Sequence, residues 1–158
     1  MKHSLKTGFS FGLTSGIITT LGLLVGLHSG TNSRAVIIGG ILTIAIADAF
    51  SDALGIHVAE EAEIKHGARE IWASTLSTFI FKFIFSSTFL LPVLFLPLNL
   101  AVAVSIIWGV ILLSIFSYIL ARQQKESPAK VMAEHIFIAL LVITLTHYLG
   151  LWISGRFV

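Results

Sequence analysis

Five long apolar stretches, separated by short polar segments, dominate the pattern of the sequence. Each stretch has about the 20 residues that an α-helix needs to cross a bilayer, so each predicts a membrane-spanning helix. The predicted spans are residues 9–28, 35–57, 71–91, 98–120 and 130–153. Pro92, Pro97 and Pro128 fall at or near the predicted turns, where proline fits. The pattern predicts an all-α protein whose five transmembrane helices form one domain, residues 1–158.

The composition supports a membrane location. Of the 158 residues, 56% are hydrophobic and only 11% are charged, whereas a soluble domain carries about 25% charged residues. The bilayer is therefore the expected surrounding. The absence of cysteine excludes disulfides and thiolate metal sites. The basic residues are spread over the connecting segments, which argues against nucleic acid as a partner.

The distribution of lysine and arginine predicts the direction of insertion. With the N-terminus inside, the outer segments hold only Arg34 and Arg156. The inner segments then hold the remaining basic residues outside the spans: Lys2, Lys6, Lys65, Arg69, Arg122, Lys125 and Lys130. The positive-inside rule favours this cytoplasmic N-terminus. The first apolar run has no A-x-A-like cleavage site, so we expect a retained span. No organelle signal is evident, and a prokaryotic cytoplasmic membrane is the expected location.

The first predicted helix carries a face of glycine and hydroxyl side chains. At about 100° per residue, its glycines fall within one arc of roughly 120°, and Ser15 and Thr19 lie on the same arc. The glycines are Gly8, Gly12, Gly16, Gly22, Gly26 and Gly30. Small residues spaced in this way let helices approach closely in lipid. The face predicts close packing within the chain, a homodimer seam or a substrate path.

Asp48 and Asp52 are the unusual residues of the second span. They are four apart, so their side chains share one face of a helix. One charged residue at the helix centre costs about 2.5–3.5 kcal/mol on insertion scales, and such residues mark ion sites or proton relays. The alternative is an internal ion pair with Lys82, which lies at a similar depth in the third span. Both interpretations can hold together if Lys82 is a resident countercharge that an arriving cation displaces.

Further acidic residues lie near the predicted cytoplasmic side. Glu134 falls near the start of the fifth span, where it could join the carboxylate cluster or serve the helix dipole. Glu60, Glu61 and Glu63 continue the second helix beyond the membrane. These three form either a solvated face or an acidic vestibule that captures divalent cations. His57 lies on the opposite side of the second helix from Asp48, so we do not place it in the same site.

Short motifs over nearly the whole chain resemble vacuolar iron transporter-like proteins. "SGIITTLGLLVG" (15–26) is similar to the first helix of that family, and "ADAFSDALG" (47–55) to the second. "FLLPVLFLP" (89–97) resembles the proline-bearing end of the third helix. "SPAKVMAEHIFIALLVITLTHYLG" (127–150) resembles the fifth. The chain is identified as a divergent, short member that lacks the cytoplasmic metal-binding domain found between helices two and three in many relatives.

The resemblance implies a function and an assembly. It implies a transporter that exports Fe²⁺ or Mn²⁺ from the cytoplasm, often in exchange for protons, and that is neither an enzyme nor in need of a cofactor. It also implies a homodimer with the first helices lining a path at the interface. Asp48 and Asp52, with hydroxyls of Ser15 and Thr19, would bind the metal, and protonation of the same carboxylates would supply the coupling.

The sequence departs from the family pattern at the expected path. The family's first-helix aspartate falls on Ser15, its second-helix methionine on Asp52, and the following glutamate on Ile56, while Asp48 matches. A carboxylate in place of a thioether favours harder ions such as Mn²⁺, Fe²⁺ or Mg²⁺. Lys82 has no counterpart in the family pattern. A second hypothesis is therefore a non-transporting membrane module for assembly or interaction, held by a buried Asp–Lys ion pair.

Overall fold

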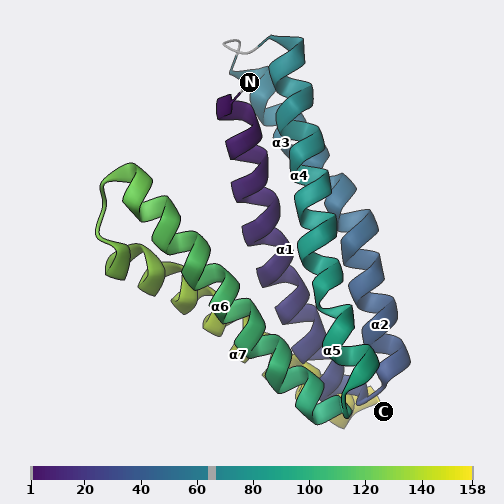
Figure 1. Cartoon of the computed structure of the whole chain (residues 1–158). Coiled ribbons are helices and arrows are strands. Elements are labelled where there is room, and N and C mark those ends of the chain that lie inside the picture. The colour runs from purple at the N-terminus through teal and green to yellow at the C-terminus, as the bar shows by residue number, and fades with distance from the viewer. Residues whose placement is uncertain (1, 64–66, 158) are drawn as a thin grey trace.

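The computed structural model describes residues 2–63 and 67–157, and these residues form helices joined by short turns (Figure 1). No strand occurs among them. In chain order the elements are α1 (Lys2–Thr31), α2 (Arg34–Thr43), a π-helical turn (Ile44–Asp48), α3 (Ala49–Ala62), α4 (Ala68–Thr88), α5 (Leu90–Phe95), α6 (Leu98–Gln124) and α7 (Pro128–Phe157).

Within the described residues, five helical spans are long and apolar enough to cross a membrane. They are His3–Thr31, Arg34–Ala62, Ala68–Phe95, Leu98–Gln124 and Pro128–Phe157. The α2 helix, the π-helical turn and α3 make the second span, and α4 and α5 together make the third. The observed helices extend beyond the predicted stretches because polar residues continue each helix past its apolar part. The prediction of an all-α membrane protein with five long helices is confirmed.

Local sequence signals account for two of the turns. The α1 helix is followed by Asn32 with a left-handed φ of 47°, a conformation that asparagine adopts more readily than most residues. Ser33 then caps α2 by accepting a hydrogen bond from the Val36 N–H. Lys125 ends α6 with a φ of 59°. Pro128 begins α7, where a missing backbone N–H removes no helical hydrogen bond.

Pro92 lies within the third span, inside α5, and not in the turn itself. Proline cannot donate a backbone hydrogen bond to the carbonyl four residues earlier, which belongs to Thr88. The α4 helix ends at Thr88. At this break the Phe89 N–H donates to the carbonyl three residues earlier, that of Ser86, at 3.2 Å. Pro92 therefore interrupts this span, and α5 continues it after the break.

The glycine face of α1 packs against two different helices of the same chain. Gly8, Gly12 and Gly16 contact α4, whereas Gly22, Gly26 and Gly30 contact α7. A Cβ atom built on Gly12 would lie 2.6 Å from the Thr78 carbonyl oxygen, too close for any real side chain. Of the three interpretations of this face, close packing within the chain is the one that the structure favours.

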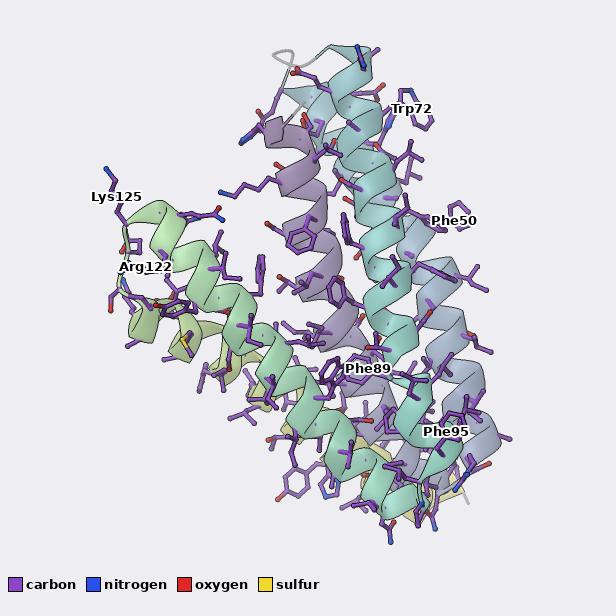
Figure 2. All side chains as sticks on the ribbon, in the orientation of Figure 1. Phe50, Trp72, Phe89, Phe95, Arg122 and Lys125 are labelled. Carbon is purple, nitrogen blue, oxygen red and sulfur yellow. The ribbon has the colours of Figure 1, made fainter. Side chains whose placement is uncertain are left out.

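The helices form two groups that separate toward one end (Figure 1). The first half of α1 lies beside α3 and α4, and the α6–α7 pair diverges from α1 toward the end where the N-terminus lies. The two groups meet at the other end, around buried residues such as Leu21, Ile37 and Phe89. Large apolar side chains, including Phe50 and Phe95, point outward (Figure 2) and are 62% and 78% exposed. Such a surface suits a lipid surrounding.

Candidate functional site

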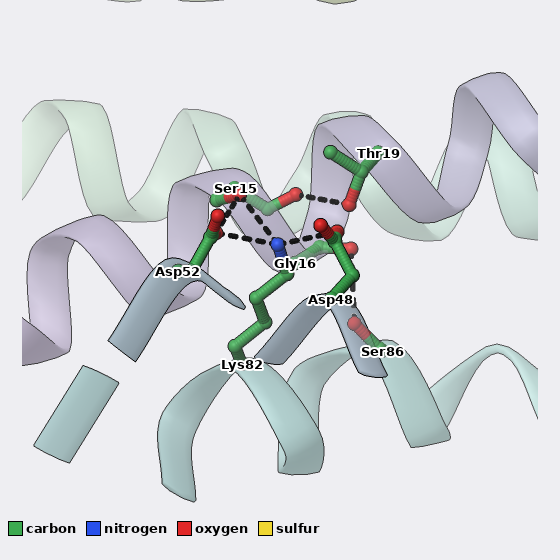
Figure 3. A network of polar contacts seen from close by, with 7 residues as sticks. All are labelled: Ser15, Gly16, Thr19, Asp48, Asp52, Lys82 and Ser86. Atoms are coloured by element: carbon green, nitrogen blue, oxygen red, sulfur yellow. Dashed lines mark hydrogen bonds and ion pairs between the residues drawn. The ribbon is translucent and has the colours of Figure 1, made fainter. Parts of the chain in front are cut away.

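Three helical spans bring four predicted residues together inside the membrane region (Figure 3). Ser15 comes from the middle of α1, and Lys82 from α4. Asp48 is the last residue of the π-helical turn, and Asp52 lies in the first turn of α3. The two carboxylates point toward the lysine from one side, as their four-residue spacing predicts.

The Lys82 ammonium group is at the centre of this cluster. Its Nζ atom lies 2.5 Å from Asp48 Oδ2 and 2.5 Å from Asp52 Oδ2. It also donates a hydrogen bond to Ser15 Oγ at 2.9 Å, and Ser15 Oγ donates to Asp52 Oδ2 at 2.6 Å. Three oxygen atoms from two spans therefore surround the positive charge that the third span supplies (Figure 3).

The helix that carries the carboxylates widens just before them. Over Ile44–Asp48 it has π-helical geometry, and the Ala49 N–H donates to the Ile44 carbonyl five residues earlier. Such a turn inserts one extra residue into the helix and often lies at functional sites. No glycine or proline occurs within the five residues of the turn. No residue type in the sequence therefore marks the π-helical turn. The turn sets the direction of Asp48 relative to α2.

The cluster is closed on the lysine side and more open on the carboxylate side. The Lys82 side chain is fully buried, whereas the Asp48 and Asp52 side chains are 36% and 20% exposed. Behind the lysine, Gly12 and Gly16 press α1 onto the α4 backbone. An ion that reaches the cluster therefore has to approach past the carboxylates and not through the seam between α1 and α4.

Thr19 and Glu134 do not take part in this cluster. The Thr19 hydroxyl donates to the Ser15 backbone carbonyl at 2.7 Å within its own helix (Figure 3). Glu134 lies on an exposed part of α7, and its carboxylate is 4.0 Å from the Lys130 ammonium group. The structure brings together Ser15, both aspartates and the lysine, and it leaves these two predicted residues outside.

The other acidic residues lie at the end of α3 and just after it. Glu61 is 58% exposed, and its carboxylate is 3.4 Å from His57 Nε2. Glu60 is buried and Glu63 is exposed. The other ring nitrogen of His57 is 2.9 Å from the Thr75 hydroxyl. His57 thus contacts α4 and Glu61, apart from the carboxylate cluster, as we expected from its position on the helix.

The donor set around Lys82 is suited to a hard cation. Carboxylate and hydroxyl oxygens are the ligands that Mg²⁺ and Mn²⁺ prefer. Among the described residues, no group of three or more His, Asp or Glu side chains is arranged to hold a metal. The cluster supplies two carboxylates and one hydroxyl, so a metal bound there would need further ligands from water or from another chain.

One feature beside the carboxylates was not predicted. Ala47, Ser51 and Gly55 are four residues apart, and all three are exposed on the outside of the chain. A Cβ atom built on Gly55 would meet nothing within 4 Å. Their spacing in the sequence is the signal that could have identified this face, because small residues at such intervals let helices approach closely in lipid.

The comparisons with known proteins give one result for this chain. The model of the family described as the VIT family matches residues 52–151, and no curated protein matches the chain. The match confirms the resemblance inferred from the sequence motifs. The matched range contains Asp52 and Lys82 and begins after Ser15 and Asp48.

Proposed function

The chain belongs to the VIT family, and from that premise we propose that it exports Fe²⁺ or Mn²⁺ from the cytoplasm through a site formed by Asp48, Asp52 and Ser15. At the level of the family, membership supports a membrane metal-ion transporter. The identity of the ion, the outward direction and an exchange for protons are parts of our proposal. The metal is the substrate, and no cofactor or catalytic group enters the mechanism.

The observation that carries the proposal is the cation already held in the cluster. Three oxygen atoms converge on the Lys82 Nζ atom at 2.5, 2.5 and 2.9 Å. Each carboxylate at this depth is costly to insert into the membrane. Two of them on one face are therefore expected where the protein binds a positive charge. The same oxygens are suited to a divalent cation once the ammonium group has moved away.

Lys82 acts in this proposal as a tethered countercharge. While the site holds no metal, the ammonium group neutralises part of the charge of Asp48 and Asp52, which keeps the empty site tolerable inside the bilayer. An arriving metal displaces it from the carboxylate side, where the aspartates are partly exposed. When the metal leaves, the lysine returns, or protons take the place of the metal on the carboxylates.

The incomplete ligand set supports a homodimer. The Asp48 side chain is 36% exposed at a depth where the outside of a single chain meets lipid. A second copy placed against the exposed face of Ala47, Ser51 and Gly55 would shield this carboxylate and offer further ligands. We therefore propose that two copies meet along this face beside the site, with Thr19 of α1 also near the path.

The acidic residues outside the cluster are proposed to capture metal before transport. By the positive-inside rule, the end of α3 and the start of α7 lie on the cytoplasmic side of the membrane. Glu60, Glu61, Glu63 and Glu134 would then raise the local concentration of divalent cations near the entrance. The expected setting remains a prokaryotic cytoplasmic membrane.

Metal uptake into proteoliposomes tests the proposal. Fe²⁺ and Mn²⁺ are offered separately, with and without an imposed pH gradient, to the wild type and to Asp52→Asn. We expect the variant to lose uptake while eluting as a folded protein. Glu126→Gln, which removes an exposed carboxylate of the α6–α7 turn, is the matched control and should transport normally. Full transport by Asp52→Asn would exclude this site.

The second candidate is a membrane module without transport, and the burial of Lys82 favours it. A fully buried lysine bonded to two carboxylates is also what a purely structural ion pair would show. In that case Asp52→Asn would change stability, and neither metal would enter the vesicles in any variant. The absence of uptake by the folded wild type would therefore select this candidate.

A further inference from the structure

The space between the two groups of helices has features that the proposed transport site does not use. Two adjoining cavities, of about 310 and 510 Å³, lie between the first half of α1 and the α6–α7 pair. Both are lined by Lys6 and Ser10 of α1 and by Phe116 and Leu120 of α6. Because they share these residues, the two cavities adjoin one another as one groove. The helices that line it, α1 and α6, diverge from each other in this region (Figure 1).

One part of the groove is apolar. Phe9 lines this part, and the Phe9 ring packs edge-on against Phe81 of α4 at 4.6 Å and against Phe116 of α6 at 5.9 Å between centroids. Its walls come from α1 and α6, with side chains that include Phe9, Leu13, Leu112, Ile115, Phe116 and Ile119. This lining is suited to hydrocarbon and not to a hydrated ion.

The other part of the groove adds polar and basic side chains to an apolar lining. It is lined toward the N-terminus of α1 by His3, Lys6, Thr7, Ser10, Gln124 and His135. No aspartate or glutamate is among the described residues that line either cavity. Within the described part of the chain, Lys6 has no ion-pair partner. Arg122 and Lys125 add positive charge at the same end of α6 (Figure 2).

We propose that an anionic phospholipid occupies this groove, with an acyl chain between α1 and α6 and its phosphate at Lys6. The apolar and basic parts follow one another along the groove, as the tail and the head of such a lipid do. Basic pockets between membrane helices recognise the head groups of anionic lipids in this way. A zwitterionic lipid gains less, since its own cation opposes Lys6.

The lipid has a structural consequence for the fold. Without an occupant, the groove would leave a gap in the membrane beside the Phe9–Phe116 contact, because the glycine contacts of α1 in this half go to α4. A bound lipid fills the gap and links the two groups of helices. This inference is independent of the proposed metal transport, because none of the residues that line the groove belongs to the carboxylate cluster.

Native mass spectrometry of the full chain in detergent tests the proposal. The protein is given an equimolar mixture of phosphatidylglycerol and phosphatidylcholine with identical acyl chains. We expect one phosphatidylglycerol per chain to be retained in preference. Lys6→Gln should reduce this preference roughly fivefold, as expected for one lysine near an anionic head group. Lys130→Gln, an exposed lysine of α7 outside the groove, is the matched control and should keep the preference.

Two further variants separate the lipid from other occupants. Ser10→Trp fills the part shared by both cavities and should remove the bound lipid from a protein that still elutes as folded. The chain has no cysteine, so Ser10→Cys gives a unique thiol, and we expect no disulfide between copies at this position. Equal retention of both lipids, displacement by inorganic phosphate alone, or efficient Ser10→Cys cross-linking would each overturn the proposal.

Discussion

Lys82 Nζ lies 2.5 Å from Asp52 Oδ2, although the two residues belong to different spans and the lysine is fully buried. The same carboxylate oxygen accepts a hydrogen bond from Ser15 at 2.6 Å. This single oxygen therefore links α1, α3 and α4. The family pattern has an aspartate in the first helix at the position of Ser15. In this chain Ser15 donates a hydrogen bond to the carboxylate of Asp52, which belongs to the second span.

We expect Lys82→Met to destabilise the protein strongly. Removing the ammonium group leaves two aspartates facing each other with no countercharge, and an uncompensated charge in a membrane helix costs about 2.5–3.5 kcal/mol on insertion scales. The triple variant Lys82→Met with Asp48→Asn and Asp52→Asn should recover most of the loss. Thermal unfolding in detergent gives the comparison, with the exposed Lys130→Met as control. Equal stability of Lys82→Met and the wild type would contradict the ion pair.

Ser15 and Thr19 form a matched pair for transport. Ser15→Ala removes a hydroxyl that contacts both Lys82 and Asp52, so we expect the affinity for transported metal to fall about tenfold, as for a lost hydrogen bond to a charged group. Thr19→Val removes a hydroxyl bonded to its own backbone, and the affinity should change less than about twofold. Concentration-dependent uptake measures both. The opposite order would place the path nearer Thr19.

Gly12→Ala tests the packing of α1 against α4, and Gly155→Ala is its control. A methyl group on Gly12 would collide with the α4 backbone, and we expect Gly12→Ala to cost about 1–3 kcal/mol of unfolding free energy. A Cβ atom on Gly155 of α7, outside the proposed dimer face, would meet nothing within 4 Å, so Gly155→Ala should be neutral or stabilising by about 0.4–1 kcal/mol. Unfolding in detergent distinguishes them. A neutral Gly12→Ala would mean that the seam is looser than described.

The proposed dimer face can be tested with a single thiol. Ser51→Cys places the only cysteine of the chain on the exposed face beside the carboxylates, and we expect a disulfide-linked dimer after mild oxidation in the membrane. Ile107→Cys, on an exposed part of α6, is the control and should remain a monomer. Cross-linking at residue 107 without cross-linking at 51 would move the interface to the other group of helices.

The sequence predicts the five long helices because length and hydropathy determine which segments can cross a bilayer. It also predicts, as one of two interpretations, the contact of Asp48 and Asp52 with Lys82, since these residues lie at a similar depth in their spans. The turn that widens the helix before Asp48 could not be predicted, because no residue type marks it. The divergence of α6 and α7 could not be predicted either, because it depends on packing between distant segments.

The α1 helix gives half of its glycine face to α4 and the other half to α7. The α1 helix is thus packed against both helix groups, one along each half of its length. A rotation of α1 about its own axis would loosen its contact with α4 at Lys82. The same rotation would change the contact of Gly26 with Thr146 on α7. A rotation of α1 that released Lys82 would therefore also change how α7 packs against it.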